Sequence, residues 1–272
     1  QEMRRSRIRN VLNKEWRVLF TDVNSTLLVT LLPVLIVGQA LLVIWLVAEL
    51  GGQAATAVPL FVASMARLSS AVPGVAALPA VEQFQVLLLS QLPFYLLLIP
   101  TMVAISFATF SIVEEKTTRT LEPLLATPVR TWELLLGKAL AGALPAVLVS
   151  WACASIAVAG VLGLGWGHLL SMLLTPTWYL SLCLLTPSVA LLSFLLGNIG
   201  SSRARDAKGA QNTSLAIILP VLVLVGMQLT GVVWFSAAFT LVLALGVGLV
   251  DVVTLRIATR LFQRESIVVN WR

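Results

Sequence analysis

Charged residues are scarce in this chain of 272 residues: they make up 11% of it, against about 25% in a soluble domain. Two long stretches, 139–199 and 209–250, contain no Lys, Arg, Asp or Glu at all. Hydrophobic residues account for 58% of the chain, and its mean hydropathy is +0.97. The shortage of charge excludes a soluble domain and predicts an integral membrane protein.

Histidine and cysteine are almost missing, with one His and two Cys. His168 alone cannot complete a Ser-His-Asp or Cys-His set, and a zinc site needs three or four convergent ligands. Cys153 and Cys183 lie in apolar runs, where cysteine behaves as a small hydrophobe. The phosphate-binding motif G-x-x-x-x-G-K-[ST] is also absent. We therefore expect no catalytic residue, metal or cofactor in this chain, and ATP must be bound by another chain.

The 18 Lys and Arg residues are grouped along the chain. All except Arg67 fall at 4–17, 116–138, 203–208 or 256–272. Basic residues of membrane proteins gather on the cytoplasmic side. Six spans with both termini in the cytoplasm place all four clusters on that side, so the net charge of +6 gives no reason to expect a nucleic-acid partner.

The predicted fold is all-α: a single polytopic membrane domain over 1–272, because each span needs about 20 apolar residues. An amphipathic pattern at the N-terminus predicts a helix lying on the cytoplasmic surface of the lipid bilayer. The predicted segments are an interfacial helix at 4–22, span 1 at 23–50, an outer loop at 51–85, span 2 at 86–113, a charged segment at 114–131, span 3 at 132–163, span 4 at 171–198, an inner loop at 199–211, span 5 at 212–232, span 6 at 235–259 and a cytoplasmic tail at 260–272.

The stretch 114–138 is the most highly charged internal part of the chain. Thr120 is placed to cap a short helix whose first turn holds Glu122 and Pro123. Pro128 ends that helix. One face of it is apolar and is formed by Leu121, Leu124 and Leu125. An apolar face in the cytosol needs cover, which favours docking against a partner.

This segment resembles the coupling helix of ABC transporter permeases of the second type, which carry a similar run, E-K-x-x-x-T-L-E-x-L-L-A-T-P-V. The sequences KEWRVLFTD, SSRARDAKGAQN and RLFQRESIV resemble the family more weakly. The resemblance is to the sodium and multidrug exporter branch. It implies a short cytoplasmic coupling helix between spans 2 and 3 of a permease subunit in the inner membrane of a prokaryote.

The same resemblance implies the partners. They are a second permease subunit, identical or homologous, and separate ATPase subunits that bind ATP and Mg. The short loop implies an ATPase held close to the membrane, as in exporters. The residues that the resemblance assigns to ATPase coupling are Glu114, Glu115, Arg119, Thr120, Leu121, Glu122, Pro123, Leu124 and Leu125.

A few polar residues interrupt the apolar stretches. Asp251 is the only carboxylate well inside a predicted span, where a charge costs about 2.5–3.5 kcal/mol on insertion scales. It is a candidate for the transport pathway or for a structural pair with a basic loop. Gln39 and Gln228 are weaker pathway candidates, as are Gln91 and Asn198. Glu15 falls within the apolar face of the 4–22 helix, and we expect it to pair with Arg119.

Small residues at Ser155, Ala159 and Gly163 predict a packing seam on span 3. Two other functions fit parts of the pattern. An ATPase-independent scaffold or sensor subunit would use the same loop to bind a soluble partner. An intramembrane protease would use the E-E-x-x-x-R pattern at 114–119, but it also needs histidines on other helices. The substrate stays open, with a weak preference for an amphiphile.

Overall fold

The structure is a computed structural model that describes residues 23–51, 59–72, 74–117, 131–203, 218–228 and 236–261. Every regular element in these ranges is a helix, as the composition predicts. The elements are α2 (Val23–Leu46), the π-helix η1 (Val47–Gly51), α4 (Pro59–Ala71), the 3₁₀ turn η2 (Val75–Ala77), α5 (Ala80–Leu89), α6 (Leu92–Tyr95), α7 (Leu98–Thr117), α9 (Thr131–Gly163), the 3₁₀ turn η3 (Gly167–Leu169), α10 (Leu170–Leu173), α11 (Pro176–Leu180), the π-helix η4 (Ser181–Leu185), α12 (Thr186–Arg203), a helix at Ile218–Gln228 and α14 (Ala237–Leu261).

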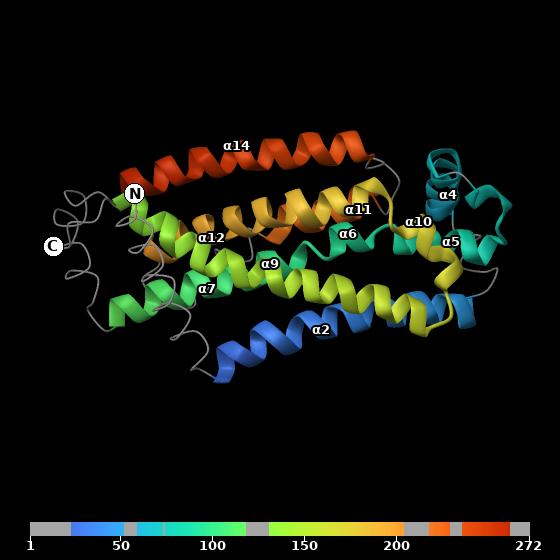
Figure 1. Cartoon of the computed structure of the whole chain (residues 1–272), viewed down its shortest axis with the longest axis horizontal. Coiled ribbons are helices and arrows are strands. Elements are labelled where there is room, and N and C mark those ends of the chain that lie inside the picture. The colour runs from blue at the N-terminus through green and yellow to red at the C-terminus, as the bar shows by residue number, and fades with distance from the viewer. Residues whose placement is uncertain are drawn as a thin grey trace.

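The long helices lie roughly parallel or antiparallel in one elongated bundle (Figure 1). α2 and α9 begin at the left end of this view, and α7, α12 and α14 end there. The short elements α4, α5 and α10 gather at the opposite end. At the left end of the bundle, α2 begins and α14 ends. Every described helix that is next to a predicted basic cluster in the sequence begins or ends there too. We call this end the inner end and the opposite one the outer end.

Five of the described helical stretches are long and apolar enough to cross a membrane. They are Thr30–Glu49, Ala80–Thr109, Leu135–Gly163, Pro176–Ser201 and Ala237–Arg260. A shorter apolar helix, Ile218–Gln228, occupies the region of the predicted fifth span. The structure thus shows a polytopic helical membrane protein, and the count of six spans stays a prediction.

The second span is at the centre of the bundle and is the most buried of the five. It begins at Ala80, ahead of the predicted start at 86, and it is broken into α5, α6 and α7. The breaks are turns at Ser90–Gln91 and at Leu96–Leu97. Pro93 lies between them and has no N–H to continue the helix.

Glycine allows the central helices to approach one another closely. Gly142 of α9 faces the ring of Phe194 of α12, and a methyl group at Gly142 would overlap that ring. One turn further along α12, a Cβ at Gly197 would lie 2.8 Å from the Ala108 Cβ of α7. The close contacts of α12 with α7 and α9 form the main apolar core, which includes buried Phe107, Ala139, Ala143, Phe194 and Leu195.

The predicted seam on span 3 does not form with any other helix of the described residues. Ser155 and Ala159 are exposed, as is Gly163. α9 instead packs on α2 through the neighbouring face, where Gly160 meets the end of the Leu41 side chain. Several faces of α9 carry small residues at helical spacing, so the pattern alone does not say which one is covered.

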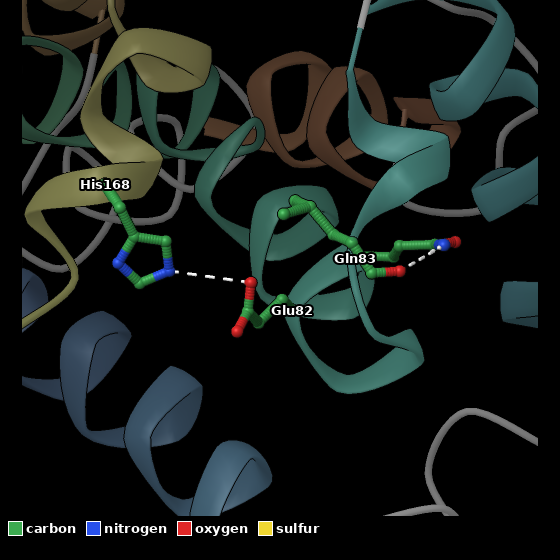
Figure 2. A network of polar contacts seen from close by, with 4 residues as sticks. Glu82, Gln83 and His168 are labelled. Atoms are coloured by element: carbon green, nitrogen blue, oxygen red, sulfur yellow. Dashed lines mark hydrogen bonds and ion pairs between the residues drawn. The ribbon is translucent and has the colours of Figure 1, made fainter.

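The outer end is tied together by polar contacts. His168 Nε2 lies 3.5 Å from Glu82 Oε2 and thereby links the turn after α9 to the first turn of α5 (Figure 2). The neighbouring Gln83 donates from Nε2 to the Leu78 carbonyl at 2.9 Å. Both contacts lie where the second span begins.

Candidate functional site

In the sequence, the predicted ATPase-coupling residues run from the end of α7 towards the start of α9. Glu114 and Glu115 belong to the last turn of α7, which ends at Thr117. α9 begins at Thr131, and both ends lie at the inner end of the bundle (Figure 1). The other coupling residues and Glu15 lie outside the described residues, namely Arg119, Thr120, Leu121, Glu122, Pro123, Leu124 and Leu125. The proposed contact of Glu15 with Arg119 therefore stays a prediction.

Asp251 lies on the face of α14 that packs against the bundle. Its exposed fraction is 5%, and its Oδ1 accepts no hydrogen bond from any described residue. Other residues at the same helical spacing are also buried or half-buried, and they are Thr240, Ala244, Val247, Thr254 and Ala258. A carboxyl group on this stripe is costly to bury, so packing alone does not explain it.

The position of Asp251 along the bundle axis can be inferred from an apolar cluster on the same helix. Ala244 packs in the same cluster as Leu185 and Val189, near the start of α12. α12 and α14 run in the same direction (Figure 1). Asp251 is two turns beyond Ala244, about 10 Å along the axis. It consequently lies in the half of the bundle that leads to the inner end.

Two further buried polar residues lie in that inner half. Lys138 and Asn198 are 4% and 1% exposed. Each is one turn beyond the Gly142–Phe194 contact, because α9 and α12 run antiparallel and both residues are four positions nearer the inner end. They therefore lie at one level on the facing sides of the two helices. Neither amide atom of Asn198 has a hydrogen-bond partner within the described ranges.

The broken second span frees carbonyl groups, and side chains from distant parts of the chain bind them. In an unbroken helix the Phe94 N–H would donate to the Ser90 carbonyl, but here it donates to Gln91 O at 3.1 Å. The Ser90 carbonyl instead accepts a hydrogen bond from Gln228 Nε2 at 3.3 Å. The fifth predicted span thus caps a break in the second, as unpaired backbone groups in a membrane require.

The fourth span supplies a second capping bond. Leu97 N–H donates to Phe94 O, which leaves the Pro93 carbonyl free to accept from Ser181 Oγ at 3.3 Å. Ser181 opens the π-helix η4, and a π segment within an α-helical span is frequent at functional sites. Trp151 of α9 donates from Nε1 to the Leu182 carbonyl of the same segment at 2.9 Å. The irregular parts of the second and fourth spans are therefore bonded to each other.

The remaining candidates for the transport pathway differ in their burial and in their contacts. Gln39 is exposed on α2, at the outside of the bundle, and contacts none of these polar groups. Gln228 and Gln91 are buried beside the break of the second span. Sequence reasoning missed Ser90 and Ser181. No sequence signal marked Ser90, because the N–H that Pro93 lacks would bind the Leu89 carbonyl, four residues earlier, and not the Ser90 carbonyl.

The described part of the chain holds no group of three His, Cys, Asp or Glu residues that could bind a metal ion. His168 faces Glu82 alone (Figure 2). What the interior does offer is hydrogen-bonding groups at two levels: neutral amides and hydroxyls at the break of the second span, and Asp251, Lys138 and Asn198 in the inner half of the bundle. Such groups suit binding and movement of a solute better than covalent chemistry.

Long apolar helices, a broken central span and buried polar groups define a polytopic helical membrane protein. The sequence model of the ABC-2 family transporter protein matches residues 9–242. Since that match covers most of the 272 residues, the chain belongs to the ABC-2 transporter family. The prediction of an ABC transporter permease is thereby confirmed, and the sodium and multidrug exporter branch stays a prediction. Comparison with curated proteins and with solved structures gave no match.

Proposed function

We propose that this chain is the membrane-spanning subunit of an ATP-driven exporter and that the segment 114–131 couples it to a separate ATPase subunit. Membership of the ABC-2 family supports a transport subunit that works with partner ATPases. The assembly contains a second permease subunit, and ATP and Mg are bound by the ATPase chains. It lies in the inner membrane of a prokaryote with both termini in the cytoplasm.

The observation that carries this proposal is the position of the charged segment. α7 and α9 are adjacent antiparallel helices whose ends, Thr117 and Thr131, lie at the same end of the bundle. The sequence between them holds the apolar face of Leu121, Leu124 and Leu125 among charged residues. A rigid helix pair that carries a short apolar segment can transmit a push from a docked subunit directly into the core, because both α7 and α9 pack on α12.

The direction of transport is argued from the length of this segment. Residues 118–130 are too few to carry helices far into the cytosol, so the ATPase lies close to the membrane. That arrangement favours export over import. An ATPase-independent scaffold would need no rigid helix pair around the loop, and this difference favours the transporter.

The proposal is tested by purifying the chain from its native membrane and identifying the proteins that accompany it. We expect an ATPase with a Walker motif. Leu124→Glu places a charge on the apolar face and should reduce ATPase retention at least about tenfold, equivalent to about 1.4 kcal/mol. Thr118→Glu adds the same charge before the predicted helix and should leave retention unchanged. A soluble partner without a Walker motif, or full retention by Leu124→Glu, would favour the scaffold.

A further inference from the structure

Three polar residues form a compact cluster at the first break of the second span, and we call Ser90, Gln91 and Gln228 the glutamine cluster. Gln91 Nε2 donates to Ser90 Oγ at 3.3 Å and to Leu87 O at 3.2 Å. Gln228 Nε2 donates to the Ser90 carbonyl at 3.3 Å. Two side-chain amides from separate spans therefore converge on one residue.

Each of these amides has an oxygen that is not used. Gln91 and Gln228 are 6% and 2% exposed, and the Oε1 atom of each accepts no hydrogen bond from the described residues. Buried polar atoms are nearly always paired, and an unpaired one costs about 1–3 kcal/mol. Two acceptors left open in one cluster indicate a site for a group that donates hydrogen bonds.

The surroundings decide which donor fits. No Lys, Arg, Asp or Glu occurs at 83–113 or at 209–250, so no anion from these two spans could balance a buried ammonium group. Neutral amide oxygens in a charge-free region favour a neutral donor. Apolar side chains lie along the same two helices, and Phe94, Leu97, Leu98 and Val221 pack together just beyond the break. A hydroxyl group attached to an alkyl chain matches both features.

We propose that Oε1 of Gln91 accepts a hydrogen bond from a hydroxyl group of an amphiphilic substrate during transport, and that Oε1 of Gln228 accepts one from a second hydroxyl group where the substrate has one, since each hydroxyl has a single proton to donate. The proposal deepens the exporter function and rests on it. The amides are enclosed in this structure, so the substrate enters only when α6 moves. α6 has four residues between two turns, and three described side chains bind at this break and the next, namely Gln91, Gln228 and Ser181.

The test is a binding measurement with two probes of matched chain length. The full chain is reconstituted in phosphatidylcholine nanodiscs, because that lipid has no hydroxyl donor. 1-Dodecanol and dodecyl methyl ether are then titrated, and the stabilisation of the protein against thermal unfolding is followed by tryptophan fluorescence. We expect 1-dodecanol to bind at least about fivefold more tightly than the ether, since one net hydrogen bond contributes about 0.5–1.5 kcal/mol. Dodecylamine should show no such advantage.

Two variants assign the preference to the cluster. Gln91→Met keeps the shape and leaves the Gln228 bond to Ser90 intact, and it should reduce the preference for the alcohol to less than about twofold. Gln39→Met changes an exposed glutamine of α2 and should leave the preference as in the unchanged chain. Equal binding of both probes, or a preference that survives Gln91→Met, would overturn the proposal.

This measurement uses neither nucleotide nor ATPase. If the alcohol preference appears but no ATPase accompanies the chain, the site stands and the exporter function fails. If an ATPase is retained but the preference is absent, the exporter function stands and the hydroxyl site fails.

Discussion

Gly142 lies directly against the ring of Phe194, so that α9 and α12 meet with no side chain between them on the α9 side. Phe194 is 2% exposed and belongs to the main core, which leaves the ring no room to move away. We expect Gly142→Ala to lower the free energy of unfolding by about 1–3 kcal/mol through overpacking, although alanine favours the helix. Unfolding of the reconstituted chain in denaturant measures the change.

Gly246 provides the matched control. It also lies inside a long helix, but a Cβ there would meet no atom within 4 Å. Gly246→Ala should therefore leave the free energy of unfolding unchanged or raise it by up to about 1 kcal/mol. Equal losses in the two variants would show that α9 and α12 do not meet at Gly142.

Gln228→Leu removes the donor that binds the Ser90 carbonyl. The expected loss in the free energy of unfolding is about 1–3 kcal/mol, because a buried acceptor is left unpaired. Gln39→Leu makes the same chemical change on an exposed position of α2 and should change the free energy of unfolding by no more than about 0.5 kcal/mol. If the two variants unfold alike, the capping bond does not stabilise the chain.

Asp251→Asn separates a functional carboxyl group from a structural one. An amide costs less to bury than a carboxyl group, and Asp251 Oδ1 has no partner to lose within the described residues. The free energy of unfolding should therefore stay the same or rise. The substrate-stimulated ATPase activity of the assembled transporter should fall at least about tenfold, equivalent to about 1.4 kcal/mol. Thr254→Val, one turn further along the same stripe, should leave that activity within about twofold.

The opposite result for Asp251→Asn is equally informative. Loss of stability with unchanged ATPase activity would mean that the carboxyl group pairs with a basic residue and holds the fold together. That outcome would remove Asp251 from the transport pathway without affecting the family assignment.

The predicted topology can be checked by labelling single cysteines in intact cells. Cys153→Ser and Cys183→Ser give a cysteine-free background. We expect Ser70→Cys, on exposed α4 at the outer end, to react with a membrane-impermeant maleimide. Arg205→Cys, in the predicted inner loop, should react only after the cells are opened. Labelling of both positions in intact cells would contradict the six-span arrangement.

Much of the fold could be predicted from the sequence because its signals are local. Long runs without charge predict membrane helices, and the basic residues predict that α2 begins at the same end of the bundle as α12 and α14 end. The second span was predicted only as a segment at 86–113, without the places where it breaks. The position of its breaks depends on which neighbour can bind the freed carbonyls, and Ser181 and Gln228 are remote in sequence.

The candidate site was harder to predict for a related reason. Gln39 and Gln228 look alike in sequence, since each is one glutamine in a charge-free apolar run. Packing alone separates them, because α2 lies at the outside of the bundle whereas the 218–228 helix faces the second span. The same holds for α9: the helical spacing of small residues was present on more than one face, and among the described residues the covered face is the one with Gly160.

The capping of Ser90 and Pro93 by residues made much later has a consequence for biosynthesis. The second span leaves the ribosome well before Ser181 and Gln228 have been translated. Until then its two exposed carbonyls must be hydrated or held by the insertion machinery, because lipid offers them no donor. The hydrogen bonding of the central span is consequently completed last. In a nascent chain truncated before Gln228, the Ser90 carbonyl would still be bound to water.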